Sequence, residues 1–417
     1  MVRMRAPSQS LGDNSGSGSS SENNDDNVEV LALIKPDILN DLRESQQRNG
    51  GETLPKLLYT QRTAQCTDPR DRVYGLLGLL RPQDDDDTTV IKIRPDYTKP
   101  TWEVYADAMS HIFSTGQGPY FLSGVFLPGL DTPSPPIPAI PITGGPKDRK
   151  QYRNQQKAEG HLLPSWVPDL SRQVGGQATQ PSGLFFHPPA GRSASGAGAI
   201  CKNGWRVSER VLKVEGLSVD TIHEVLSFGA STEEVVGNLP RFENATKQAI
   251  ERSRAHPEHE PDSIKAMIQS FGVKEPLWRT LISNRRYISG YDDAPSVYED
   301  MYLQLRLHPD ISASALQDDD NEYRKCLAEG KANKSFFTTT SSGLVGTCVP
   351  DSRAGDTVAI LFGSPTPFVL RPLRVEGDYG KVYALIGGCY TGGIMDGEMV
   401  DELYCEDLVD SVPFYIT

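Results

Sequence analysis

The spacing of apolar residues predicts helices in the first part of the chain and strands toward its end. Helical spacing is present over residues 69–80, 100–116 and 231–330. Residues 209–226 instead alternate apolar and polar positions, and from residue 335 onward short apolar runs are separated by glycine-containing turns, which is typical of strands. The first helical pattern is carried by Val73, Leu76, Leu77 and Leu80.

These patterns predict an α+β fold: a helical N-terminal part plus a C-terminal small antiparallel β-barrel-like domain with a helical insertion. A lone hairpin at 209–226 would be only marginally stable, so we expect it to pair with the strands at 335–390 in one sheet and to share backbone hydrogen bonds with 357–390. The predicted domains are a mostly disordered low-complexity segment (1–52), a helical region (53–127), an irregular Pro/Gly-rich connection (128–205), a discontinuous β-rich domain (206–230 and 334–417) and a helical insertion (231–333).

The start of the first helix has its own local chemistry. Thr67 or Asp68 can cap the free N–H groups, and Pro69 suits the first helical position. Asp71 places a carboxylate where the helix dipole favours negative charge. A ligand or partner contact through the charged cluster around Arg70 is the alternative, but capping explains these residue types, so we favour a structural role.

Five sequence motifs follow one another along the chain. They are Thr-Asp-Pro-Arg-Asp-Arg-Val-Tyr-Gly-Leu-Leu-Gly-Leu (67–79), Pro-Asp-Tyr-Thr-Lys (95–99), Leu-Pro-Ser-Trp-Val-Pro-Asp-Leu-Ser (163–171), Ala-Gly-Asp-Thr-Val-Ala-Ile-Leu-Phe-Gly (354–363) and Tyr-Ala-Leu-Ile-Gly-Gly-Cys-Tyr-Thr-Gly-Gly-Ile-Met-Asp-Gly-Glu (383–398). In this order they resemble the region that follows the signature domain of fungal heterokaryon-incompatibility (HET-domain) proteins. The motif residues, to which we assign structural roles, are Asp68, Pro69, Arg70, Asp71, Tyr74, Leu77, Gly78, Pro95, Asp96, Tyr97, Trp166, Pro168, Asp169, Gly355, Asp356, Gly387, Asp396, Gly397 and Glu398.

The resemblance implies a role in fungal nonself recognition, where fusion of unlike hyphae triggers programmed cell death. The signature blocks of the HET domain are not found in the sequence, so the expectation is a regulatory or recognition portion with a protein partner and no catalysis of its own. One alternative is part of a TIR-like nucleotide-hydrolysing effector whose catalytic domain is missing here. The other is a protein-interaction scaffold without a cell-death role.

Charge and composition limit the kinds of partner that are expected. The formal net charge is -13, which argues against nucleic acid or an anionic membrane as the main partner. No apolar run approaches the roughly 20 residues needed to span a bilayer. The six cysteines are scattered and form no Cys-x-x-Cys motif, which favours a reducing, cytoplasmic location.

No group of residues has the spacing of a catalytic, cofactor-binding or metal-binding site, and we predict none. Asp84 to Asp87 lack the spaced ligands of a calcium loop and are expected to form a solvated loop. His256 and His259 could suit zinc, but Pro257 lies between them, so a polar loop is favoured.

Three further features have a structural explanation. The glycine-rich 387–398 stretch has no following lysine and contains carboxylates that repel phosphate, so it is interpreted as a tight turn closing the sheet. Cys389 has no histidine nearby in sequence, and Ser341-Ser342-Gly343 lacks the Gly-x-Ser-x-Gly elbow, which disfavours nucleophilic roles. Trp166 is expected to be a packing anchor on an extended segment.

Overall fold

The computed structural model describes residues 40, 42–61, 64, 66–81, 91–124, 163–170, 193–196, 204–208, 210–255, 264–287, 292–308, 321–329, 334–373 and 381–417. The chain divides into two compact units, the first made of residues 1–52 and 79–82 and the second of residues 53–78 and 83–417. In the first unit, residues 42–49 are helical, although they fall in the segment predicted to be mostly disordered. The Ser45 hydroxyl donates to Glu52, which forms a β-bridge with Leu80.

Short helices follow residue 53. They are α2 (Leu54–Thr60), α3 (Asp71–Tyr74), the 3-10 turn η1 (Leu77–Leu79), α4 (Thr101–Ser114) and α5 (Gly118–Gly124). The prediction of one continuous helix over 69–80 is wrong: a turn at Gly75 separates the four-residue α3 from η1. Glycine inside a helix costs about 1 kcal/mol relative to alanine, and Gly75 and Gly78 both fall in this short run. The helix predicted at 100–116 is present as α4.

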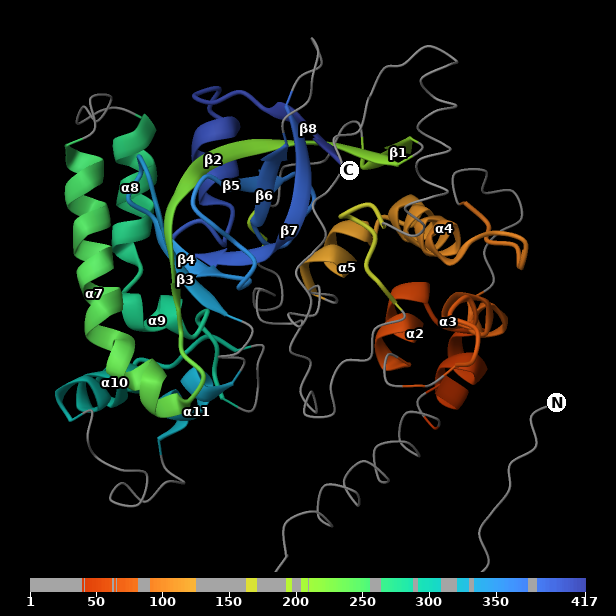
Figure 1. Ribbon diagram of the computed structural model, residues 1–417, viewed down its shortest axis with the longest axis horizontal. Coiled ribbons are helices and arrows are strands. Elements are labelled where there is room, and N and C mark those ends of the chain that lie inside the picture. Colours follow the sequence, from red (N-terminus) through yellow and green to blue (C-terminus); the bar gives the residue numbers. More distant parts are fainter. Residues whose placement is uncertain are drawn as a thin grey trace, which may run out of the picture. The chain divides into compact units, whose positions relative to one another are not determined.

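Six antiparallel strands close into a ring in the C-terminal part of the chain. The strands of this part are β1 (Arg206–Ser208), β2 (Val211–Ser227), β3 (Ser335–Thr339), β4 (Val345–Cys348), β5 (Thr357–Leu361), β6 (Phe368–Leu373), β7 (Val382–Thr391) and β8 (Val412–Ile416). Neighbours follow the order β2-β3-β4-β7-β6-β5, and β5 pairs back with β2 (Figure 1). The long β2 therefore belongs to the ring although 107 residues (228–334) separate it from β3.

The pairing of β2 with β5 is the long-range contact expected from the sequence. It runs from Gly216 opposite Leu361 to Thr221 opposite Thr357, with one register shift between Ser218 and Asp220. The α+β fold with a barrel-like C-terminal domain is confirmed. The chain between β2 and β3 contains α7 (Thr232–Arg254), α8 (Ile264–Lys274), α9 (Leu277–Leu281), α10 (Val297–Leu307) and α11 (Glu322–Ala328). The domain boundaries given above stay a prediction.

Two hydrophobic cores lie on opposite faces of the ring wall. Successive side chains of a strand point to opposite faces, and in β3 Phe337 belongs to the core inside the ring while Phe336 belongs to the core formed with the helices. The ring of Phe336 lies 5.1 Å from that of Phe242 in α7. All five residues of β3 are buried, because α7 covers the outer face of this strand.

Candidate functional site

The barrel wall has a break along one edge of β2. Gly216 pairs with both Leu361 of β5 and Val412 of β8, so these two strands lie on opposite edges of β2. Ring closure places β3 on the same edge as β8. Pairing with β8 covers residues 212–216 and pairing with β3 covers residues 222–227. Among the described strands, none pairs with residues 217–221 on this edge.

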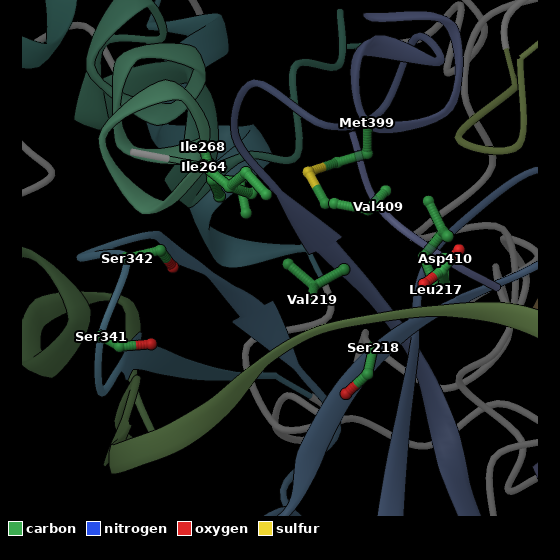
Figure 2. Close-up of a pocket in the computed structure, with 10 residues that line it drawn as sticks. All are labelled: Leu217, Ser218, Val219, Ile264, Ile268, Ser341, Ser342, Met399, Val409 and Asp410. Carbon is green, nitrogen blue, oxygen red and sulfur yellow. The ribbon is translucent and has the colours of Figure 1, made fainter. Parts of the chain in front are cut away.

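A pocket of about 390 Å³ opens at this break. Leu217 and Val219 point to one face of β2 and Ser218 to the other, and all three line the pocket, so it lies at the edge of the strand. Figure 2 shows apolar side chains gathered above Val219, with Ser341 and Ser342 on one side, Asp410 on the opposite side and Ser218 below. The other lining residues are Ile264 and Ile268 of α8, Ser341 and Ser342 of the β3–β4 turn, and Met399, Val409 and Asp410 of the C-terminal segment.

Asp220 fixes the β3–β4 turn beside the pocket. Its carboxylate accepts the backbone N–H of Ser341 at 3.0 Å and of Ser342 at 2.7 Å. Both serine hydroxyls also donate to it, at 2.8 and 2.6 Å, and the N–H of Thr221 donates at 2.7 Å. Burial acts to raise the pKa of Asp220, but the hydrogen bonds from these neighbours outweigh it and hold the pKa below its usual value.

This geometry does not activate either serine as a nucleophile. A carboxylate whose pKa is lowered is a weak base, and activation requires a group able to remove the hydroxyl proton. The described residues that line the pocket include no histidine, lysine or cysteine. Ser342 is buried, and its hydroxyl also lies 3.1 Å from that of Thr339. The arrangement orders a turn and leaves an apolar pocket next to it.

The structure brings the first two sequence motifs together. Arg70 donates to the backbone carbonyls of Tyr97 and Lys99, and pairs with the Asp68 carboxylate at 2.7 Å. The Tyr97 hydroxyl donates to Asp71 at 2.6 Å, and the Arg70 guanidinium lies 5.2 Å from the Tyr97 ring centre. Asp68 also accepts the backbone N–H of Arg70. The prediction that Thr67 or Asp68 caps the helix is wrong, because α3 begins at Asp71 and its N-cap residue, Arg70, makes no side-chain capping bond.

Aromatic side chains complete this junction. The Tyr74 hydroxyl donates to the carbonyl of Asp96 at 3.1 Å, and that of Tyr105 in α4 donates to the carbonyl of Pro69 at 2.9 Å. Leu77 and Gly78 lie in η1, and Pro95 directly precedes Asp96. The contacts hold the start of α3 against the segment before α4, so the motif pair has a structural explanation within the fold.

The Trp166 segment is attached to the barrel. Trp166 is fully buried, and its ring N–H donates to the carbonyl of Arg210, just before β2, at 3.0 Å. The hydroxyl of Ser165 accepts the backbone N–H of Leu385 in β7 and donates to the carbonyl of the last residue, Thr417. Pro168 and Asp169 continue this segment at half-buried positions.

The remaining motif residues lie in turns of the barrel. Asp356 is 1% exposed and pairs with Arg371 of β6 through two bonds of 2.9 Å. Gly355 before it has φ +91°, a conformation that favours glycine. Gly387 lies in β7 opposite Val369.

The predicted turn after β7 is present. The backbone N–H of Asp396 donates to the side chain of Glu398, and the one-turn helix η4 (Val400–Tyr404) follows. Gly397 has φ +97°, and a Cβ there would lie 2.6 Å from the Cα of Gly196. Burial raises the pKa of Glu398.

Several candidates from the sequence lie elsewhere or outside the described residues. Asp84 to Asp87 and the His256–His259 loop are outside them. Cys389 is fully buried, and burial raises the pKa of its thiol. Within the described ranges, no cluster of three or more His, Cys, Asp or Glu side chains could hold a metal ion, and no helix is long and apolar enough to cross a membrane.

The pocket itself was not predicted from the sequence. The sequence pattern shows of Ser341 and Ser342 only that they lack a nucleophile elbow, and it assigns no role to Asp220. One signal was present: Asp220 places a carboxylate between Val219 and Thr221, in the middle of a strand of alternating apolar residues. A buried or half-buried carboxylate needs hydrogen-bond donors, so this position indicated a partner from another segment.

Comparison with known proteins finds a family model that matches part of the chain. Residues 243–409 match the family model described as the Het-6 beta-barrel domain. The resemblance to the fungal heterokaryon-incompatibility family is confirmed. The Het-6 barrel match contains β3 to β7, whereas β2, the strand that closes the ring, precedes it.

One curated relative extends the similarity to the N-terminal part. The chain is 25% identical over 399 residues to "Heterokaryon incompatibility protein 6, OR allele" of Neurospora crassa, an alignment that covers 85% of this chain. The chain spans about half the length of that relative, which it covers to 53%. No solved structure matches the chain. Outside the Het-6 barrel match, the alignment therefore also includes much of the helical part.

Proposed function

We propose that this chain is a regulatory or recognition portion of a heterokaryon-incompatibility protein and acts by binding a protein partner, without catalysis of its own. The observation that carries the proposal is the pocket at the break in the barrel wall. Its lining is mainly apolar, and two of its three serines, Ser341 and Ser342, are hydrogen-bonded to a carboxylate that is a poor base. Such a site suits a contact with another molecule better than it suits acyl or phosphoryl transfer.

The similarity to the Neurospora protein supports a role in fungal nonself recognition and in the control of cell death. It covers most of this chain, so the proposal is not limited to the barrel. The cytoplasm is the location that fits this role, because incompatibility follows the mixing of two cytoplasms after hyphal fusion.

The experiment that tests the proposal separates binding from turnover. The chain is expressed in a fungal strain, fusions with an unlike strain are scored for cell death, and the purified chain is assayed for consumption of NAD and ATP. We expect a changed incompatibility reaction and no nucleotide consumption. Nucleotide turnover by the purified chain would refute the proposal in favour of an effector enzyme. Stable self-association with no effect on fusion or growth would favour a scaffold without a cell-death role.

A further inference from the structure

We propose that the pocket at the break in the barrel wall binds an extended, basic segment of a partner protein, with one apolar side chain of that segment inserted into the pocket. The inference rests on the proposed function and names the chemistry of the partner. Three independent features of the site lead to it: an available strand edge, an apolar pocket beside that edge, and a one-sided distribution of charge.

The strand edge comes first. Among the described strands, none pairs with β2 between β8 and β3, and the N–H of Thr340 donates to the carbonyl of Thr221 at the far end of this gap. Only the three residues from Leu217 to Val219 remain available in this gap, because β8 and β3 occupy the same edge on either side of it. The gap therefore allows a few main-chain hydrogen bonds to one extended segment, and the pocket beside it receives a side chain of that segment.

The pocket supplies the position for an apolar side chain. Leu217, Val219 and Ile268 are buried and form its inner wall, while Ile264 is 37% exposed at its mouth. Met399 and Val409 complete the wall from the C-terminal segment (Figure 2). An apolar side chain inserted here would be removed from water, which favours binding.

The charge of the C-terminal segment indicates which kind of partner binds. Between Lys381 and the last residue the chain contains seven carboxylates and no lysine or arginine. Seven of the 13 excess negative charges are thus concentrated in the segment that forms one wall of the pocket. The seven are Asp396, Glu398, Asp401, Glu402, Glu406, Asp407 and Asp410.

Most of these carboxylates face solvent. Asp401, Glu402, Glu406, Asp407 and Asp410 are exposed, and within the described part of the chain none of these five forms a salt bridge. Leu408 and Val412 add exposed apolar surface beside them. A segment that carries lysine or arginine around an apolar residue complements both properties, and complementary charge speeds association and suppresses acidic partners.

Peptide titration tests this directly. The probe is a fluorescein-labelled peptide in which lysines alternate with valines around a central leucine, and its matched control has glutamate at every lysine position. We expect the full chain to bind the lysine peptide, with affinity falling as salt rises, and to bind the glutamate peptide at least about tenfold more weakly. Equal binding of the two peptides would overturn the inference.

Two variants locate the binding. Ile264→Arg places a cation in the mouth of the pocket and should weaken binding of the lysine peptide about tenfold. Leu303→Arg changes an equally exposed leucine on α10 and should have no effect. The pair Asp407→Asn and Asp410→Asn should weaken binding about threefold, the size expected for exposed charges, whereas Glu299→Gln with Asp300→Asn on α10 should not. Equal effects of the pocket and α10 variants would overturn the inference.

The fusion assay separates this inference from the proposed function. If the unchanged chain alters the incompatibility reaction and Ile264→Arg alters it equally, the recognition role stands and the pocket is not its site. If the unchanged chain has no effect on fusion, the proposed function fails, and the peptide titration still decides whether the pocket binds basic segments.

Discussion

Along β2, one edge pairs with β5 in a ladder that ends at Asp356. On the other edge no described strand pairs with residues 217–221, and the side chain of Asp220 binds the turn beside this gap. Ile222 exchanges backbone hydrogen bonds with Asp356 and Gly355, and the Asp356 carboxylate is neutralised by Arg371 of β6. Asp220 is held by serine hydroxyls and backbone N–H groups and has no cationic partner among the described residues.

The difference shows how a barrel can keep a gap in its wall. A bidentate Arg–carboxylate pair has fixed geometry and joins two neighbouring strands, β5 and β6. The Asp220 carboxylate instead collects five donors from a turn and from its own strand, which holds Ser341 and Ser342 at one end of the pocket. One aspartate stabilises a closed edge, and the other stabilises the border of an open one.

The largest expected effect comes from breaking the closed edge. Arg371→Met leaves the buried Asp356 carboxylate without its cation, and we expect a loss of about 3 kcal/mol in the free energy of unfolding. Urea unfolding followed by circular dichroism measures this. Arg306→Met is the control, because its partner Glu243 is nearer the surface and keeps a hydrogen bond from Tyr302. That variant should lose no more than about 1 kcal/mol.

A double variant separates the charge from the strand contact. Asp356→Leu combined with Arg371→Met removes both partners, and it should recover part of the stability that Arg371→Met alone loses. If Arg371→Met loses no more stability than Arg306→Met, the ion pair does not hold this edge. The comparison between the two edges then fails.

The second effect concerns the open edge and depends on pH. Asp220→Asn loses the charge that the serine hydroxyls and N–H groups stabilise, and we expect a loss of about 2 kcal/mol at neutral pH. The pKa of Asp220 is lower in the folded chain than in the unfolded one. Its stabilising contribution is therefore complete above the unfolded pKa of about 3.9 and is lost as the pH falls through the folded pKa.

Urea midpoints of Asp220→Asn and the unchanged chain should therefore converge as the solution is acidified below about pH 4. A stability difference that stays constant from neutral to acidic pH would show that the side chain contributes through packing and not through its charge.

Local patterns made the barrel and α4 predictable. The alternation over 209–226 indicated a strand that needs a sheet, and the turn-rich sequence after residue 335 supplied its partners. The helix at 100–116 followed from its apolar spacing alone. The helix predicted over 69–80 is too long, because its apolar spacing continues through two glycines that disfavour a helix.

The pocket could not be predicted in the same way. It depends on where the ladders of β8 and β3 end on β2, and those strands are separated from β2 by long stretches of sequence. Register between distant strands is a tertiary property that no local pattern contains. The motif residues Arg70 and Tyr97 are the opposite case. Their motifs follow each other in the sequence, which indicated that they belong together, and in the structure the two residues are in direct contact.

The smallest effect sharpens the description of the open edge. Ser341 and Ser342 both donate to Asp220, but only Ser342 is buried and also lies beside the hydroxyl of Thr339. We therefore expect Ser342→Ala to lower the free energy of unfolding by about 1 kcal/mol and Ser341→Ala by about 0.5 kcal/mol, both at neutral pH. In the background of Asp220→Asn, each alanine substitution should cost less, because its charged acceptor is gone. Additive losses in the double variants would mean that Asp220 does not organise this turn, and that the gap between β8 and β3 is maintained by the apolar lining alone.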